Sequence, residues 1–405
     1  MRILVVSPRF PWPLDKADSM TVYHFLEFFS QRHEIDLLAF GEHGFGHAFK
    51  REYVSHVRSF CRRIEVVPLR KAATCIQCTR SLLSSDPLQV WYYRRKAMHE
   101  ALHRMIEFGD YDLVYTHLLR MAQYTRHLEN QRKVLAMQIS LALEYRRLAE
   151  QQENIRNPLK CWLYRLEAKK LRTYEASATR LFDRTLVIGE TDRSEIVANG
   201  GAGSSLYLNP HGVDLPSGEA QANDRIPDSI VFAGNMSNDP NIDAATWFSR
   251  SILPRIGQRI PNVRFFILGS SPPKRVRKLQ SDSRIVVTGY VENLDAWISR
   301  CLVAVDPMRI GAGLQNKILE AMALKLPVVA TSVANEGICA KHGDEILIAD
   351  DEEEFADRVV ALLQDQSLRD SLARAGHRMV HERFTWEHHY ADLEAEFLRI
   401  AAGTA

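Results

Sequence analysis

The chain has 405 residues, and 52 lysine and arginine residues nearly balance 50 aspartate and glutamate residues. Its 46% hydrophobic and 25% charged residues exclude a wholly disordered chain. No apolar run reaches the roughly 18–20 residues of a transmembrane helix, and the first residues lack the apolar core of a signal peptide. We therefore expect a soluble, cytoplasmic protein of two or three domains.

The six cysteines are too few for a disulfide scaffold. Cys75 and Cys78 form one CxxC pair, with no second pair and no histidine at zinc spacing, so we expect no metal site.

A basic segment extends from Lys50 to Lys96, with eleven basic and three acidic residues. Its cluster from Trp91 to Lys96 combines aromatic and cationic side chains, as membrane-interface segments do. Two interpretations stay open: residues 50–96 make a peripheral contact with an anionic membrane, or they form a solvated basic face. We expect no nucleic-acid partner.

Runs rich in β-formers alternate with segments of helical spacing in the first half of the chain. The pattern predicts strands over 2–7, 35–40, 112–117 and 186–189, and helices over 22–29 and 157–179.

The same alternation begins again after a polar stretch, residues 216–228, which we interpret as a linker. It predicts strands over 229–234, 263–269, 285–289, 302–306 and 326–331, and a final helix over 386–402. Strands separated by helices indicate parallel sheets. We therefore expect an N-terminal domain over 1–215, completed by helix 386–402, and a second domain over 229–385.

The segment from Met308 to Ala323 is the most informative one for chemistry. It follows a predicted strand, turns at Gly311 and Gly313, and begins a helix at Gln315 or Asn316. A helix N-terminus at the carboxyl edge of a parallel sheet offers free N–H groups to a diphosphate.

Three charged side chains accompany this turn. Arg309 and Lys317 flank it and are placed to neutralise phosphate oxygens, while Glu320, one helical turn further on, is placed to accept hydrogen bonds from a ribose. The alternative is a structural strand–turn–helix with a surface arginine and lysine, since the chain has no P-loop and no GxGxxG motif.

The second half resembles the donor-binding domain of retaining glycosyltransferase family 4, and most closely its bacterial branch found with exopolysaccharide and exosortase systems. The resemblance lies in Phe232–Met236, Pro240–Ala244, Trp247–Phe248, Phe266–Gly269, Val287–Val291 and Arg309–Ala323. It covers residues 229–390 well and the first half in short stretches. It implies an α/β GT-B fold, with two doubly wound Rossmann-like domains facing each other across a cleft and a C-terminal helix that crosses back to the first domain.

The resemblance also implies roles for single residues. Arg309 and Lys317 take the place of the basic residues that contact the diphosphate, and Glu320 that of the ribose-binding glutamate. The other donor-binding positions that it implies are Gly234, Asn235, Val291, Gly311, Gly313, Leu314, Gln315 and Asn316.

The chain departs from the family pattern at three places. Ala312 stands where many relatives have a first glutamate near the donor sugar. The segment from Asn235 to Asp243 lacks the arginine and lysine that many relatives carry there, and the first loop reads Lys16-Ala17-Asp18-Ser19 instead of Lys-Gly-Asp-Lys.

The N-terminal half is expected to bind the acceptor. His117 ends a predicted strand, where it either bonds the transferred sugar as a catalytic group or is a structural histidine at a strand end. Glu190, Lys16 and Asp18 are further acceptor-binding candidates.

The function implied is the transfer of a hexose-type sugar from a nucleoside-diphosphate sugar, UDP- or GDP-linked, to a hydroxyl of a glycan or lipid-linked acceptor. The reaction retains the anomeric configuration and needs no metal and no cofactor. It would serve bacterial cell-surface glycan or exopolysaccharide assembly at the inner face of the membrane. The alternatives are a catalytically degenerate nucleotide- or glycan-binding protein and a nucleotide-sugar epimerase.

Overall fold

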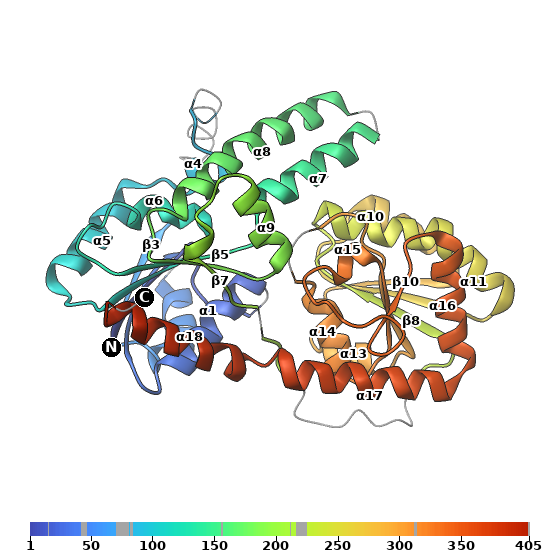
Figure 1. The fold of residues 1–405 in the computed structure, drawn as a ribbon. Coiled ribbons are helices and arrows are strands. Elements are labelled where there is room, and N and C mark those ends of the chain that lie inside the picture. Colours follow the sequence, from blue (N-terminus) through green and yellow to red (C-terminus); the bar gives the residue numbers. More distant parts are fainter. Residues whose placement is uncertain are drawn as a thin grey trace. The chain divides into compact units, whose positions relative to one another are not determined.

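The computed structural model describes residues 1–14, 16–41, 47–69, 81, 84–154, 157–210, 212–215, 225–311 and 314–403. The chain divides into two compact units. The first comprises Met1–Pro210 and Glu387–Ala405, and the second comprises His211–Trp386. Each unit is a sheet covered by helices on both faces (Figure 1).

The first unit contains a seven-stranded parallel sheet in the order β3-β2-β1-β4-β5-β6-β7. Its strands are β1 (Arg2–Ser7), β2 (Glu34–Gly41), β3 (Arg63–Pro68), β4 (Leu113–His117), β5 (Lys133–Gln138), β6 (Arg184–Val187) and β7 (Leu206–Leu208). Its helices are α1 (Ala17–Phe29), α2 (His47–Arg58), α4 (Leu88–Tyr93), α5 (Lys96–Phe108), α6 (Ala122–Thr125), α7 (Leu141–Asn154), α8 (Pro158–Ala178), α9 (Glu190–Ala198) and α18 (Trp386–Ala401).

The last helix of the chain, α18, packs against α1 of the first unit. The rings of Phe25 and Phe29 lie 6.1 and 5.4 Å from that of Phe397, and Glu394 pairs with both His33 and Arg32. Burying these large aromatic side chains stabilises the return of the chain to its first half. The predicted return of the C-terminal helix is thereby confirmed.

The second unit contains a six-stranded parallel sheet in the order β10-β9-β8-β11-β12-β13. Its strands are β8 (Ser229–Ala233), β9 (Arg264–Leu268), β10 (Ile285–Gly289), β11 (Val303–Asp306), β12 (Val328–Ala330) and β13 (Leu347–Ile348). Its helices are α10 (Asp239–Trp247), α11 (Leu253–Arg259), α12 (Lys274–Arg277), α13 (Leu294–Ser299), α14 (Asn316–Ala323), α15 (Ser332–Asn335), α16 (Glu352–Gln364) and α17 (Gln366–Arg383).

The central strands of both sheets are almost wholly buried hydrophobic runs, as expected when helices cover both faces of a parallel sheet. The second unit begins at His211, before the linker predicted over 216–228. The reason is that Val213 pairs with Thr385 and donates its N–H to the carbonyl of Phe384 at 2.9 Å. Residues 216–224 of that linker lie outside the described residues.

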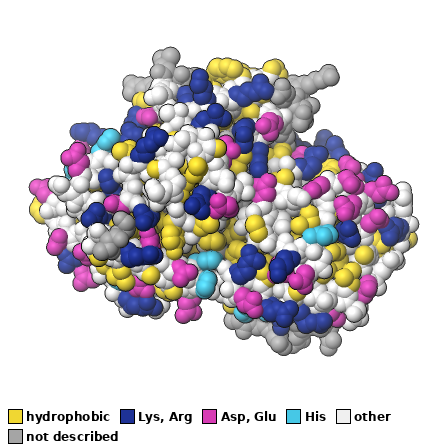
Figure 2. Space-filling model, in the orientation of Figure 1, with side chains coloured by type: hydrophobic (Ala, Val, Ile, Leu, Met, Phe, Trp, Pro, Cys, Tyr) yellow, Lys and Arg dark blue, Asp and Glu magenta, His cyan; other side chains and the backbone are white. Residues whose placement is uncertain are grey.

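The basic segment over 50–96 is described only in part, because residues 70–80 (with Cys75 and Cys78), 82 and 83 lie outside the described residues. Several of its described cations are in ion pairs: Arg62 with Asp36 at 2.7 Å, Arg94 with Asp86 at 2.6 Å and Lys96 with Glu100 at 3.1 Å. Over the face shown in Figure 2, basic and acidic side chains are largely intermixed.

Within the described part of the chain, no helix combines the length and the hydrophobicity needed to span a bilayer.

A buried carboxyl group caps the first turn of α7. Glu175 of α8 is fully buried and accepts hydrogen bonds from the Ser140 hydroxyl at 2.9 Å and the Ala142 N–H at 3.0 Å. Burial raises the pKa of Glu175 to about 8, the nearby Asp192 carboxylate adds to the shift, and the hydrogen bonds oppose it. The folded first unit therefore holds a proton on Glu175 at neutral pH.

This proton makes the stability of the first unit depend on pH. The unfolded chain releases it near the ordinary glutamate pKa of 4.5, whereas the folded unit keeps it up to about pH 8. The stabilisation that Glu175 contributes is therefore complete below the unfolded pKa and falls as the pH rises toward 8. We predict that Glu175→Gln flattens this fall, measured as the urea-unfolding free energy at several pH values between about 5 and 8. Parallel pH profiles for the variant and the wild type would contradict the conclusion that folded Glu175 holds a proton at neutral pH.

Candidate active site

The strand order of the second sheet sets the place of the site. β8 and β11 are neighbours, while β9 and β10 continue on one side and β12 and β13 on the other. In sheets of this type, ligands bind outside the carboxyl ends of the strands where the order reverses. The loop after β8 and the turn between β11 and α14 meet at this point.

The loop after β8 is held by Asn241 of α10. The Asn241 amide donates to the Asn235 carbonyl at 2.9 Å, and Asn235 in turn accepts from the Ser237 N–H at 2.9 Å. A Cβ atom at Gly234 would lie only 2.9 Å from the Asn241 amide nitrogen, so a side chain there would displace the Asn241 amide. Gly269 has φ +139°, and a Cβ there would lie 1.8 Å from the Gly234 carbonyl oxygen.

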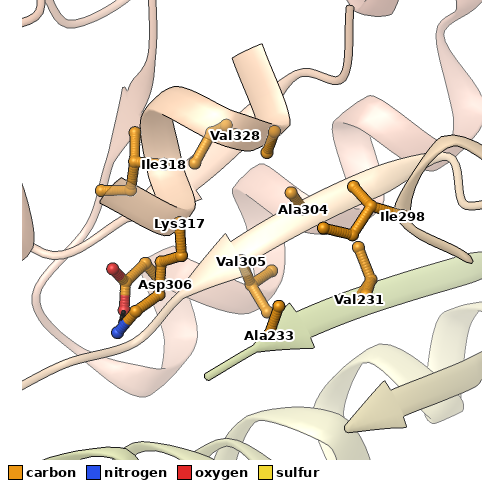
Figure 3. A pocket seen from close by; sticks show the side chains of 10 residues that line it. Val231, Ala233, Ile298, Ala304, Val305, Asp306, Lys317, Ile318 and Val328 are labelled. Atoms are coloured by element: carbon orange, nitrogen blue, oxygen red, sulfur yellow. Dashed lines mark ion pairs between the residues drawn. The ribbon is translucent and has the colours of Figure 1, made fainter. Parts of the chain in front are cut away.

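The ammonium group of Lys317 lies at the centre of the site. Its Nζ donates to Asn241 Oδ1 at 3.0 Å, lies 2.8 Å from Met308 Sδ and sits 3.6 Å from Asp306 Oδ1. It also lies 5.2 Å from the centroid of the Phe232 ring, a cation–π distance. Figure 3 shows the Lys317 and Asp306 side chains pointing toward each other, from the first turn of α14 and the end of β11.

Asp306 and Lys317 form an ion pair that is largely removed from water. The Asp306 side chain is fully buried and that of Lys317 is 14% exposed. Burial raises the pKa of Asp306 and lowers that of Lys317, and the attraction between the two charges opposes both shifts. The neighbouring cavity, of about 10 Å³, has room for one water molecule at most, so it is too small for a diphosphate.

Arg309 is the second cation of the site and lies in the loop between β11 and α14. It makes a two-point ion pair with Asp243 of α10, at 3.1 and 2.7 Å, and its guanidinium carbon lies 5.0 Å from the Trp247 ring. Its side chain is 48% exposed, so it keeps contact with solvent. The site thus contains one buried and one exposed cation, each beside a carboxylate from another element.

Glu320 lies one turn after Lys317 on α14. Burial raises its pKa to about 7, the carboxylates of Asp295 and Asp214 raise it further, and Lys317 opposes the shift. A carboxyl group with this pKa changes its charge around neutral pH. Among the residues that the structure describes, no group of three or more His, Cys, Asp or Glu side chains is arranged to hold a metal ion.

The other predicted donor-binding residues that the structure describes lie just before or at the start of α14, except Val291, which follows β10. The Gln315 carbonyl accepts from the Ile318 N–H at 3.0 Å and so begins α14, whose first residue is Asn316. Leu314 is partly buried and packs against the core of the second unit, and Gly311 is buried. Val291 follows β10 and is half-buried. Gly313 and Ala312 lie outside the described residues.

The acceptor candidates occupy similar positions in the first unit. There the strand order reverses between β1 and β4. His117 ends β4, is fully buried and lies with its ring 6.3 Å from that of Tyr115. Lys16 and Asp18 lie at the start of α1, where the Asp18 carboxylate pairs with Arg9 at 3.0 Å. Glu190 begins α9 and is exposed, 3.4 Å from Arg193 of the same helix.

A family model of known proteins matches part of the second unit. Residues 227–365, from β8 to α16, match the family model described as Glycosyl transferases group 1. That segment contains Asn241, Asp306, Arg309, Lys317 and Glu320.

A similar sequence over most of the chain is that of an uncharacterized 44.6 kDa protein in the cps region of Klebsiella pneumoniae. The two are 22% identical over 370 residues, which cover 89% of this chain and 90% of the other.

Solved structures of similar fold cover nearly the whole chain. Anabaena HepE in complex with UDP has a TM-score of 0.65 at 14% identity, over 98% of this chain and 100% of the other. Sucrose-phosphate synthase from Thermosynechococcus elongatus has a TM-score of 0.71 at 16% identity, over 99% of both chains. With the two parallel sheets, these similarities show that the chain has the GT-B fold of two Rossmann-like domains.

Sequence reasoning missed three residues of the site. Asp306 reads as the last residue of a buried strand, and Asn241 and Asp243 entered only through the family resemblance, without roles. Asp306 could have been identified because it is an acid at the end of an otherwise apolar strand, at the switch point, the place where the strand order of the sheet reverses. The contacts of Asn241 and Asp243 span 76 and 66 residues, a distance at which sequence spacing gives no information.

The buried pair predicts a non-additive effect on stability. Asp306→Asn leaves the Lys317 ammonium without its counter-charge and should cost about 3 kcal/mol. Combining it with Lys317→Met removes both charges, so the double variant should be more stable than Asp306→Asn alone. Urea unfolding of the wild type, both single variants and the double variant measures this coupling. Additive costs would show that the two side chains do not interact.

Proposed function

We propose that this protein is a nucleotide-sugar-dependent glycosyltransferase, which transfers a sugar from a nucleoside diphosphate to an acceptor hydroxyl. One observation carries the proposal: Lys317 and Arg309 both lie at the carboxyl edge of the second sheet, at its switch point. Both residues belong to the segment that matches the family model of group 1 glycosyl transferases. Cations in this position suit a bound diphosphate.

The transfer reaction requires that the leaving diphosphate be stabilised as negative charge develops on it. Lys317 is suited to this because Asn241 and Asp306 hold its ammonium in place in surroundings of low polarity. The half-exposed Arg309 supplies a second cation once a phosphate competes with Asp243 for its guanidinium. With these two charges the proposed reaction needs no metal and no cofactor.

Glu320 is proposed to hold the nucleotide ribose, since an ionised carboxylate accepts hydrogen bonds from two neighbouring hydroxyls. UDP is the first nucleotide to test, because HepE has been solved with UDP, UDP-glucose, and UDP with glucose. GDP-sugars are the second choice. The donor sugar is proposed to be a hexose-type sugar, transferred with retention of configuration.

The acceptor is proposed to bind to the first unit near Lys16, Asp18, His117 and Glu190. The location of the Klebsiella relative in a cps region supports a role in cell-surface polysaccharide assembly, with a glycan or lipid-linked acceptor. We further propose that the protein acts in the cytoplasm at the membrane surface. Residues 50–96 are one candidate for that contact.

Lys317 provides the direct test of the transfer reaction. A thermal-shift screen across UDP-, GDP- and ADP-sugars first identifies the donor. With that donor, the Lys317→Ala variant should form the nucleoside diphosphate product at least about 100-fold more slowly than the wild type, because a preorganised charge is lost. Lys341→Ala is the matched control, as Lys341 is an exposed lysine of the same unit. Equal rates for Lys317→Ala and the wild type would contradict the proposed role of Lys317 in stabilising the leaving diphosphate. Donor binding without transfer to any acceptor would favour the catalytically degenerate alternative.

Glu320 makes the affinity for the donor depend on pH. Because its pKa is raised to about 7, it gains a proton as the pH falls and can then no longer accept from both ribose hydroxyls. Affinity for a UDP-sugar, whose esterified diphosphate does not titrate in this range, should therefore weaken several-fold between about pH 8 and pH 6. Calorimetry on Glu320→Gln should give weak binding at both pH values. A variant that kept the wild-type pH dependence would contradict the proposed ribose contact.

A further inference from the structure

The outward face of α8 carries exposed hydrophobic side chains that the proposed reaction does not use. Leu159 is 74% exposed and Trp162 is 57% exposed, and the two lie three residues apart in the first turns of the helix. Residues at this spacing share one face of a helix. An exposed tryptophan beside an exposed leucine is a costly surface in water, and such patches commonly mark a binding site.

The same face is strongly basic. Arg165, Lys169 and Arg172 follow Trp162 at intervals of three, four and three residues and are all exposed. Lys160 is also exposed, but it lies two residues before Trp162 and so on another side of the helix. Both acids of α8, Glu167 and Glu175, are buried, so the exposed side of this fully described helix carries only positive charge.

The opposite side of α8 is anchored to the body of the first unit. Glu167 accepts from the Leu88 N–H at 2.7 Å, and Lys170 donates to the Ser81 carbonyl at 2.6 Å. The Tyr164 ring packs against Tyr145 of α7 with 5.6 Å between centroids. Asn157 caps the N-terminus of the helix, where its side chain accepts from the Lys160 N–H at 3.3 Å. The exposed face therefore belongs to a well-anchored helix and not to a frayed end.

The surface view agrees with this description. Along the upper edge of the first unit in Figure 2, over α8, hydrophobic and basic side chains lie side by side.

From this arrangement, we propose that the outward face of α8 docks the first unit onto an anionic lipid bilayer. Trp162 and Leu159 would enter the headgroup region, where indole rings are favoured. The cations along the next turns would lie against anionic headgroups. From Leu159 to Arg172 the face is about 20 Å long, enough to contact several lipids.

A bilayer fits this face better than a soluble polyanion does. Cations alone would suffice for a polymer, whereas the apolar pair at the end of the stripe gains free energy only where it leaves water. The proposal does not depend on the transfer reaction, and its test needs no enzyme activity.

The test is flotation of the full chain with vesicles of phosphatidylcholine, with and without about 30% phosphatidylglycerol. The wild type should float with the anionic vesicles and detach at high salt. Leu159→Ser/Trp162→Ser and Lys169→Glu/Arg172→Glu should each weaken binding at least about 10-fold. The fluorescence of the wild type should shift to the blue on binding, and Trp162→Phe should lose most of that shift.

Two matched variants control for general changes in hydrophobicity and charge. Phe108→Ser removes another exposed aromatic side chain of the first unit, 78% exposed, and Arg374→Glu/Arg378→Glu makes the same charge change on α17. Both should float like the wild type, and circular dichroism should show every variant folded. Equal binding to both kinds of vesicle, or wild-type binding by both α8 variants, would overturn the proposal. So would binding to a soluble anionic polysaccharide without any binding to vesicles.

Discussion

The second unit is organised around one charge that is kept out of water, the ammonium group of Lys317. An ammonium group loses much of its hydration when it is buried, and it stays charged only where other groups replace the water. Here Asp306 supplies the counter-charge, Asn241 a hydrogen-bond acceptor and Phe232 an aromatic face. Each comes from a different element, so the ammonium position depends on the packing of β8, β11, α10 and α14 together.

This arrangement gives the ion pair a use beyond stability. A buried ion pair is often no more stable than well-packed hydrophobic residues in its place. A cation that is fixed and poorly hydrated, however, needs little reorganisation when an anionic ligand arrives, and that is the condition for electrostatic stabilisation of a leaving group. Arg309 differs, since it is half exposed and its guanidinium is paired with Asp243, so in the proposed reaction it would exchange that carboxylate for a phosphate.

The two units have the same architecture but show different chemistry at the point where the strand order reverses. In the second unit this point holds two cations beside carboxylates. In the first unit the corresponding strands end at a buried histidine, His117, and near the Arg9–Asp18 ion pair. This difference agrees with the proposal that the second unit binds the anionic donor and the first unit the acceptor. The basic face of α8 is a third feature of the first unit, and the proposed docking on a bilayer is built on it.

The sequence predicted the parallel α/β architecture well, because buried strands such as β1 and β8 are short apolar runs bounded by turns. The sequence also predicted the turn before α14, because glycines, cationic residues and the first residues of a helix follow one another there. The partners of those cations were not predictable, because Asn241 and Asp243 meet them only through the tertiary packing of α10. The basic face of α8 is not predictable from the sequence for a similar reason. Only the structure shows that its acids are buried while its cations and Trp162 are exposed.

The most direct test of the central claim is a crystal structure of the protein with uridine diphosphate, in which the distance from Lys317 Nζ to the nearest phosphate oxygen is measured. We predict about 3 Å, with the nucleotide at the carboxyl edge of the second sheet. An ordered nucleotide bound elsewhere, with Lys317 still bonded to Asn241 and Asp306 and no phosphate oxygen within reach, would contradict the account.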